Sequence, residues 1–156
     1  MKLIKSMMGA VSLVAATGAA AGDYTLSRTL QLSAPSSEVW NLIGDLCDID
    51  DWHPDIGGCA LKVVDGRLHR VLMTNKGMEF VEKLVAVETG LSHTYSTKSA
   101  PFPVEKYVTT LSVEPIGGSQ VRWSARFSSD DPTTETEIAE MIETGLAAIK
   151  ASFDPN

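Results

Sequence analysis

Alternation of apolar and polar positions runs through most of the chain. Residues 24–33 alternate strictly, which predicts a half-buried strand. Six further segments of strand character follow residue 58, and short turns such as Asp65-Gly66 and Asn75-Lys76-Gly77 separate them. Short turns between consecutive strands predict an antiparallel meander. We place the six strands at 59–64, 67–74, 78–88, 91–99, 104–114 and 121–128.

Helical spacing predicts two short helices and one long one. Ser36 and Ser37 precede Glu38, an N-cap pattern that opens a short helix with an apolar face. The acidic segment 48–55, which ends around Pro54, predicts a second short helix or turn. A loop at 130–134 ends in a cap. Residues 135–153 then carry apolar side chains at helical spacing: Ile138, Met141, Ile142, Leu146 and Ile149.

The order of elements predicts an α+β fold. One strand, two short helices, six strands and a long C-terminal helix follow one another. The long helix is the only element large enough to cover one face of a seven-stranded sheet, so we expect a curved antiparallel sheet wrapped round it. Such an arrangement leaves an interior gap, which is the natural place for a ligand.

The N-terminus has the features of a cleavable signal peptide. Lys2 and Lys5 precede the apolar stretch 9–16, and the small residues 19–21 allow cleavage after Ala21. The stretch is short for a membrane span, and a retained N-terminal anchor is the alternative. We therefore expect a signal peptide at 1–21, one domain at 22–156, and a periplasmic or secreted protein. No second long apolar segment follows, which predicts no integral membrane segment after cleavage.

Charge narrows the choice of partners. The chain holds 13 basic and 20 acidic residues, a net charge of −7. Removing residues 1–21, which contain two lysines and no acid, leaves 11 basic and 20 acidic residues, or −9. Such a surface repels phosphate backbones, so nucleic acid is not expected as a partner, and anionic membranes are disfavoured for the same reason. A basic protein partner fits this charge better.

The two cysteines, Cys47 and Cys59, are the only ones in the chain. In an oxidising compartment, an even pair with none left over favours a disulfide, which would be worth roughly 3 kcal/mol in the chain-entropy model. Two buried free thiols are the alternative, because the sequence alone does not fix the separation of the two Cα atoms.

Several segments resemble the helix-grip superfamily (SRPBCC proteins), which includes START domains, the birch-pollen allergen fold and polyketide cyclase/dehydrase-like proteins. The residues are Val39 to Cys47, then Asp51-Trp52-His53-Pro54 up to Cys59, and the runs 81–84 and 111–115, which resemble one bacterial group. The resemblance implies a fold and an interior cavity that holds a hydrophobic small molecule or a lipid. It also implies two alternatives: an accessory protein that docks on a periplasmic enzyme, as in bacterial methanol oxidation, and a polyketide cyclase or dehydratase-like enzyme.

Period-2 spacing proposes which side chains face that cavity. Phe80, Glu82, Leu84 and Ala86 share one face, which the resemblance to plant hormone receptors of the superfamily identifies as concave. If residues 75–77 form a three-residue turn, Arg70 lies opposite Glu82 and neutralises it; another turn length breaks the pairing. We take the pair as either a ligand anchor or a purely structural salt bridge. The candidate ligand-binding residues are Arg70, Phe80, Glu82, His93, Tyr95, Thr97, Tyr107, Thr109, Trp123 and Met141.

Trp52 and His53 form a second cluster, which we place at the pocket mouth. His53 has acidic neighbours, but no two of the three histidines have the spacing of metal ligands, so we expect no metal site. The chain has no G-x-S-x-G elbow and no glycine-rich phosphate loop, so no catalytic residue is assigned and no cofactor is expected.

Overall fold

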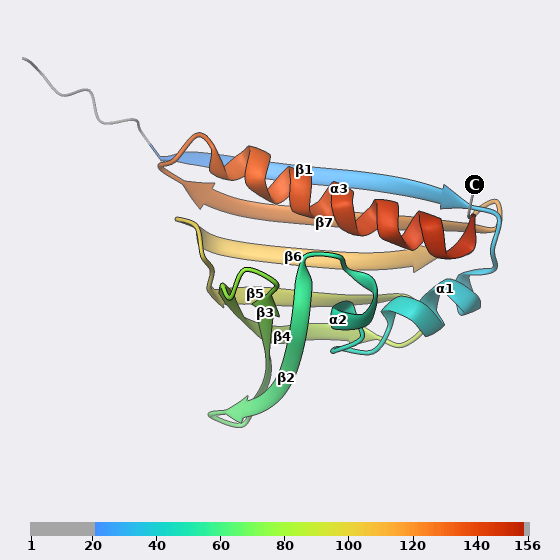
Figure 1. Ribbon diagram of the computed structural model, residues 1–156, viewed down its shortest axis with the longest axis horizontal. Coiled ribbons are helices and arrows are strands. Elements are labelled where there is room, and N and C mark those ends of the chain that lie inside the picture. Colours follow the sequence, from blue (N-terminus) through green and yellow to red (C-terminus); the bar gives the residue numbers. More distant parts are fainter. Residues whose placement is uncertain (1–20, 155–156) are drawn as a thin grey trace, which may run out of the picture.

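A seven-stranded antiparallel sheet is the frame of the molecule (Figure 1). The computed structural model describes residues 21–154. The strands lie in the order β1-β7-β6-β5-β4-β3-β2, so the first strand pairs with the last. The predicted α+β helix-grip fold is confirmed. Its strands are β1 (Gly22–Leu32), β2 (Ile56–Val64), β3 (Arg67–Thr74), β4 (Glu79–Glu88), β5 (Ser92–Ser99), β6 (Glu105–Glu114) and β7 (Ser119–Ser129).

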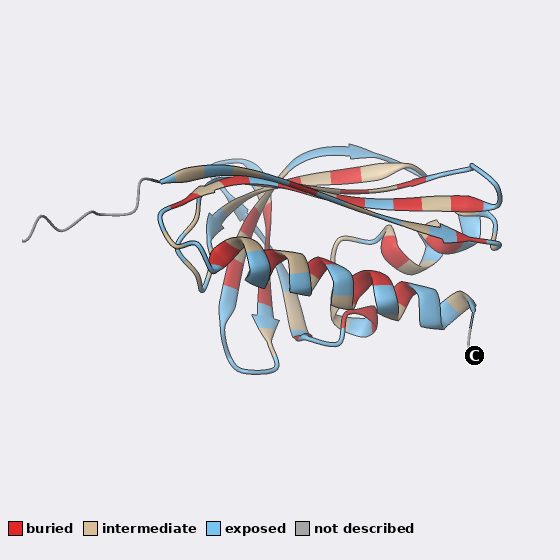
Figure 2. Cartoon of the chain, turned by 90° about the horizontal axis from the view of Figure 1, so that it is seen from above, coloured by how far each residue is buried: buried red, intermediate tan, exposed pale blue. Residues whose placement is uncertain are grey.

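Three helices accompany the sheet. The two short ones, α1 (Ser36–Ile43) and α2 (Ile49–Trp52), follow β1, and α3 (Thr134–Phe153) ends the described chain. α3 runs along the sheet with one face turned inward, which Figure 2 shows as a row of buried positions. Its buried apolar side chains are Ile138, Ile142, Leu146 and Ile149. Within residues 21–154, no helix is long and apolar enough to cross a membrane.

The helix starts differ from the expected capping pattern. α1 begins after Pro35, and its first N–H groups donate to the Pro35 carbonyl oxygen rather than to a serine hydroxyl. At α3, the Asp131 carboxylate accepts hydrogen bonds from the backbone N–H and the hydroxyl of Thr133. These bonds lower the pKa of Asp131. The sequence pattern predicted where α1 and α3 begin, but the hydrogen bonds at the two helix starts involve other groups than the expected serine and threonine caps.

The turn between β3 and β4 sets the register of the sheet beneath the site. Thr74 N–H donates to the Met78 carbonyl across residues 75–77, and Gly77 has φ +77°, which glycine adopts without strain. This three-residue turn places Arg70 opposite Glu82, which is the pairing that the sequence analysis expects for this turn length. Further along β4, the register with β5 shifts after Leu84. Ala86 is therefore exposed and does not face the concave side of the sheet, where the sequence analysis placed it. A β-bulge explains this difference, because it breaks the period of two.

Residues 1–20, which belong to the predicted signal peptide, lie outside the described residues. The predicted disulfide is present: Cys47 and Cys59 are bonded, with their Cα atoms 5.4 Å apart. The closed loop contains the whole of α2, so the bond attaches this short helix to the edge strand β2.

Candidate functional site

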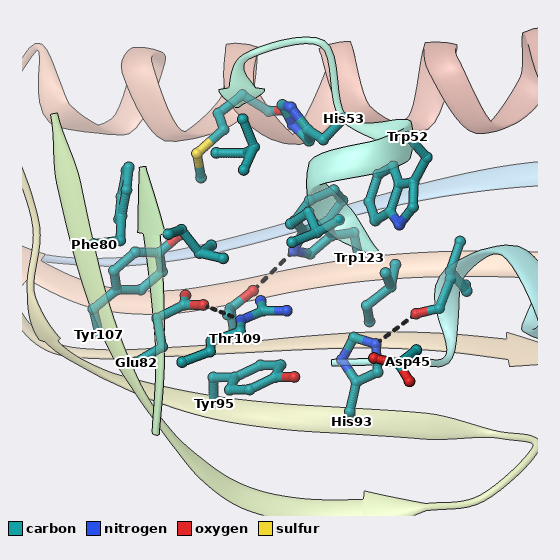
Figure 3. A pocket seen from close by; sticks show the side chains of 17 residues that line it. Asp45, Trp52, His53, Phe80, Glu82, His93, Tyr95, Tyr107, Thr109 and Trp123 are labelled. Atoms are coloured by element: carbon teal, nitrogen blue, oxygen red, sulfur yellow. Dashed lines mark hydrogen bonds and ion pairs between the residues drawn. The ribbon is translucent and has the colours of Figure 1, made fainter. Parts of the chain in front are cut away.

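An inner cavity of about 30 Å³ lies between the concave face of the sheet and the helices (Figure 3). Side chains from every strand except β1, together with residues of α2, α3 and the end of α1, line it. At this volume the cavity admits only one or two water-sized groups. The lining residues are Ile43, Asp45, Ile49, Trp52, His53, Ile56, Arg70, Leu72, Phe80, Glu82, His93, Tyr95, Tyr107, Thr109, Leu111, Trp123 and Met141.

A buried ion pair crosses the floor of this cavity. Arg70 Nε donates to Glu82 Oε2 at 2.7 Å, and both side chains are about 5% exposed. Arg70 also donates from Nη1 to the Leu46 carbonyl at 2.9 Å, and its guanidinium lies 3.7 Å from the centre of the Tyr95 ring. Glu82 neutralises the guanidinium, and the carbonyl and the ring orient it. The floor of the cavity is thus polar but without net charge.

His93 is held as a neutral imidazole at one end of the cavity. Its Nε2 lies 3.0 Å from the Ile43 carbonyl oxygen, which can only accept, so Nε2 carries the proton and donates. Burial lowers the pKa of His93 to about 4, and the nearby charge of Arg70 acts in the same direction. Nδ1 is therefore an unprotonated acceptor at neutral pH.

Three buried polar atoms of cavity-lining residues have no hydrogen-bond partner among residues 21–154. They are Trp52 Nε1, His93 Nδ1 and the Tyr95 hydroxyl. Their residues are 8%, 4% and 1% exposed, and all three line the cavity. A buried polar group without a partner costs about 1–3 kcal/mol. Such groups in a protein interior indicate a place where another molecule can supply the missing bonds.

Trp123, Thr109 and His53, which also line the cavity, make hydrogen bonds within the protein. Trp123 Nε1 donates to Thr109 Oγ1 at 2.9 Å, and Thr109 in turn donates to the Ser124 carbonyl. The Nε2 atom of His53 is 3.0 Å from the carbonyl oxygen of Met141 on α3. Its Nδ1 accepts a bond from the Asp55 backbone N–H. Since Nδ1 accepts, Nε2 donates to Met141, and His53 joins α2 to α3.

Burial lowers the pKa of His53 and raises that of Tyr95 to about 12. The pKa of Tyr107 is raised as well, again because of burial. These side chains are therefore neutral hydrogen-bonding groups at neutral pH. The arrangement offers neutral donors and acceptors that can orient a ligand.

A second, larger hollow opens to the surface beside the inner cavity. This outer groove has a volume of about 460 Å³ and lies between α3, the β3–β4 turn and the loop 101–103. Ile56, Phe80 and Met141 line both the groove and the inner cavity, so they form the partition between them. The other lining residues are Asp55, Thr74, Asn75, Lys76, Met78, Pro101, Phe102, Pro103, Asp131, Glu137, Glu140 and Thr144.

The structure brings most of the sequence-predicted residues together. Trp52 and His53 line the inner cavity, as do nine of the ten candidate ligand-binding residues. Thr97 does not line it. The β4–β5 register shifts between Val81 and Glu82, and Thr97 lies directly opposite Glu82. Its Oγ1 is buried without a partner within the described residues.

Sequence reasoning missed Asp45, Leu72 and the whole outer groove. Leu72 could have been found, because it lies two residues from Arg70 on the same strand face. Asp45 sits in the loop after α1, where no periodicity operates. Within residues 21–154, no group of three or more His, Cys, Asp or Glu side chains is arranged to hold a metal ion.

Comparison with known proteins identifies the family. The family model described as polyketide cyclase / dehydrase and lipid transport matches residues 23–154, and the chain belongs to this family. XoxI from Bacillus cereus is a similar solved structure, 29% identical with a TM-score of 0.70; the match covers 84% of this chain and 94% of that one. No curated protein matches the sequence.

Two more distant structures share the fold. The ZhuI aromatase/cyclase from a Streptomyces species is 11% identical, with a TM-score of 0.69 over 85% of this chain and 94% of that chain. Major latex-like protein 151 from Panax ginseng is 17% identical, with a TM-score of 0.69 over 85% of this chain and 99% of that chain. At these identities the likeness concerns the fold alone.

Proposed function

We propose that this protein is exported and holds a hydrophobic small molecule or a lipid in the outer groove and the inner cavity. The observation that carries the proposal is the partition formed by Ile56, Phe80 and Met141, which lies between the large outer groove and the small inner cavity with its buried polar groups. The family description, which includes lipid transport, supports it.

The volumes indicate how a ligand would enter. Small-molecule sites usually measure about 300–1,000 Å³, a range that includes the outer groove but not the inner cavity. A ligand that reaches from one to the other must move the partition. Met141 is half-buried and unbranched, and such side chains change rotamer at low cost. We therefore expect the apolar body to rest in the groove and one end to pass Met141.

Export is part of the proposal. The predicted signal peptide at 1–21, with the mature domain at 22–156, would deliver the chain to the periplasm or the exterior. Disulfides persist in oxidising compartments, and the Cys47–Cys59 bond fits such a location.

The test is native mass spectrometry, followed by solvent extraction, of the mature protein purified from the exported fraction of its own cells. We expect a reproducible co-purifying small molecule. Met141→Trp should abolish it by filling the partition, whereas Met73→Trp should not, because Met73 lies on β3 and lines neither hollow. A ligand-free mass from several growth conditions would contradict the binding function.

A second function is favoured by two observations, the small inner cavity and the acidic charge of the mature chain. An accessory protein that docks on a basic partner in the periplasm needs charge but no large cavity. In that case the same preparation would be free of small molecules, and cross-linking in the exported fraction would capture one partner at low but not at high salt.

A further inference from the structure

The charged side chains that line the outer groove are mostly acidic. Asp55 lines it from the loop before β2, and Asp131 from the loop before α3. Glu137 and Glu140 line it from α3. Among the described residues that line the groove, Lys76 is the only basic one, so these five side chains have a formal charge of −3. Four acidic side chains to one basic exceeds the ratio of the mature chain, 20 to 11, so negative charge is concentrated in the groove.

No ion pair within residues 21–154 neutralises these four carboxylates. The ion pairs of this part of the chain are Arg28–Glu143 and Arg70–Glu82, and none of the four side chains belongs to them. Asp131 is held in its charged form by two hydrogen bonds to its carboxylate, which lower its pKa. The groove therefore offers negative charge that has no counter-charge in the described structure.

The floor of the groove, in contrast, is apolar. Phe80 and Phe102 pack edge to face, with their ring centroids 5.5 Å apart, and Met141 lies beside Phe80 in the partition. The Ser129 hydroxyl donates to the Pro103 carbonyl oxygen at 2.6 Å, which fixes the loop that carries Phe102. An uncharged apolar molecule on this floor would take water from the carboxylates above it and give them no partner. A cation with an apolar body avoids that cost.

The helix α3 brings the two features together. Glu137 and Glu140 lie one helical turn or less from Met141, and all three line the groove. Side chains three and four residues apart on a helix are neighbours, with Cβ atoms about 5–6 Å apart. Two carboxylates are thus adjacent to an apolar residue of the floor, so one small molecule can contact both.

On the basis of the proposed binding function, we propose that the ligand is a hydrophobic ammonium ion. Its apolar part lies on the floor of the outer groove, and its ammonium group lies beside Glu137 and Glu140. Asp55 and Asp131 add to the negative potential that attracts it. The volume of about 460 Å³ matches a small-molecule site, whereas a protein partner usually needs about 800 Å² of surface a side. A second copy of the chain would be repelled, because each mature copy has a net charge of −9.

Three probes that share one ring system test this inference: 2-naphthylmethylamine, 2-naphthylmethanol and 2-naphthylacetate. Binding to the mature protein is measured by titration calorimetry. The amine should bind about tenfold tighter than the alcohol, as expected for two partly exposed charge interactions, and the acetate should bind weakest. The preference for the amine over the alcohol should shrink severalfold between about 0.1 M and about 1 M salt, because the screening length falls from about 10 Å to about 3 Å.

Matched variants locate the charge that matters. Glu137→Gln/Glu140→Gln should remove most of the preference for the amine. Glu88→Gln/Glu114→Gln makes the same change in net charge at the last residues of β4 and β6, which do not line the groove, and should keep the preference. Lys76→Gln should tighten binding of the amine, and a gain in affinity cannot come from a loss of folding.

Other results overturn the inference. Equal affinities for the amine and the alcohol would mean that the groove does not select for charge, and tightest binding of the acetate would mean that it selects the opposite charge. A short lysine-rich peptide that binds where the amine does not would assign the groove to a basic protein segment. No binding of any probe, or a neutral or anionic ligand extracted from the native protein, would refute the ammonium site. Only a ligand-free native preparation bears on the proposed function itself.

Discussion

The buried ion pair between Arg70 and Glu82 allows a quantitative test of how the site is built. Both side chains are about 5% exposed, and the two charges lie 2.7 Å apart. Glu82→Leu leaves the guanidinium with its bond to the Leu46 carbonyl but without a counter-charge. Removing one partner of a buried pair costs about 3–5 kcal/mol, and Arg70→Met should cost a similar amount by stranding the carboxylate.

The double variant Arg70→Met/Glu82→Leu removes both charges. It loses the bond to the Leu46 carbonyl, worth about 1 kcal/mol, but buries no uncompensated ion. We expect it to be at least about 2 kcal/mol more stable than either single variant. The four proteins thus form a double-mutant cycle with a large coupling energy.

Urea unfolding, followed by circular dichroism and tryptophan fluorescence, measures the effect. With a slope of about 2 kcal/mol per molar urea, a loss of 4 kcal/mol lowers the midpoint by about 2 M. Single variants that do not fold at all would still be informative if the double variant folds. Additive losses, with the double variant least stable, would refute the reasoning, because the two charges would then not depend on each other.

Three further predictions concern the walls of the site. The pKa of His93 is 6.5 in the unfolded chain and about 4 in the folded protein, so between these pH values only the unfolded chain binds the proton. The free energy of unfolding should therefore fall by about 3 kcal/mol as the pH falls from 6.5 to about 4, and urea titrations of His93→Gln should show a smaller fall. Replacing both Cys47 and Cys59 with serine should lower the free energy of unfolding by about 3 kcal/mol; an unchanged urea midpoint would show that the loop is rigid without the bond. Gly145→Ala should cost about 1–3 kcal/mol in thermal unfolding, since its Cβ would lie 2.6 Å from the Trp123 ring, while Ala148→Gly on the same helix should lose only the usual propensity difference of about 1 kcal/mol.

Local rules predicted the parts of the fold that local geometry controls. The three-residue turn at 75–77 fixes the β3–β4 register, so the pairing of Arg70 with Glu82 follows once the turn length is known, and the sequence left that length open. Period-2 spacing put His93 and Tyr95 on one face, and both line the cavity. The order of elements, with one long helix for one sheet face, determined the architecture.

The remaining features of the site depend on contacts between residues far apart in the sequence, which no short segment predicts. A bulge after Leu84 turns Ala86 outward, and Thr97 does not line the cavity although it lies directly opposite Glu82. The cavity volume is the small difference between two large quantities, the space enclosed by the sheet and helices and the summed volume of the side chains that fill it. The free N–H of Trp52 also depends on tertiary packing, because α2 is positioned by the Cys47–Cys59 bond and by contacts with β2.

The pairing of the first strand with the last has a consequence for how the chain acquires its structure. β1 is bonded along its whole length to β7, across a sequence separation of about a hundred residues. During synthesis β1 therefore has no partner until nearly the entire polypeptide has been made. Contacts this distant slow folding, with typical times of milliseconds to seconds for such topologies. For the export proposed above, this delay would keep the chain unfolded during passage through a membrane, because the sheet cannot close while its C-terminal third is still being translated.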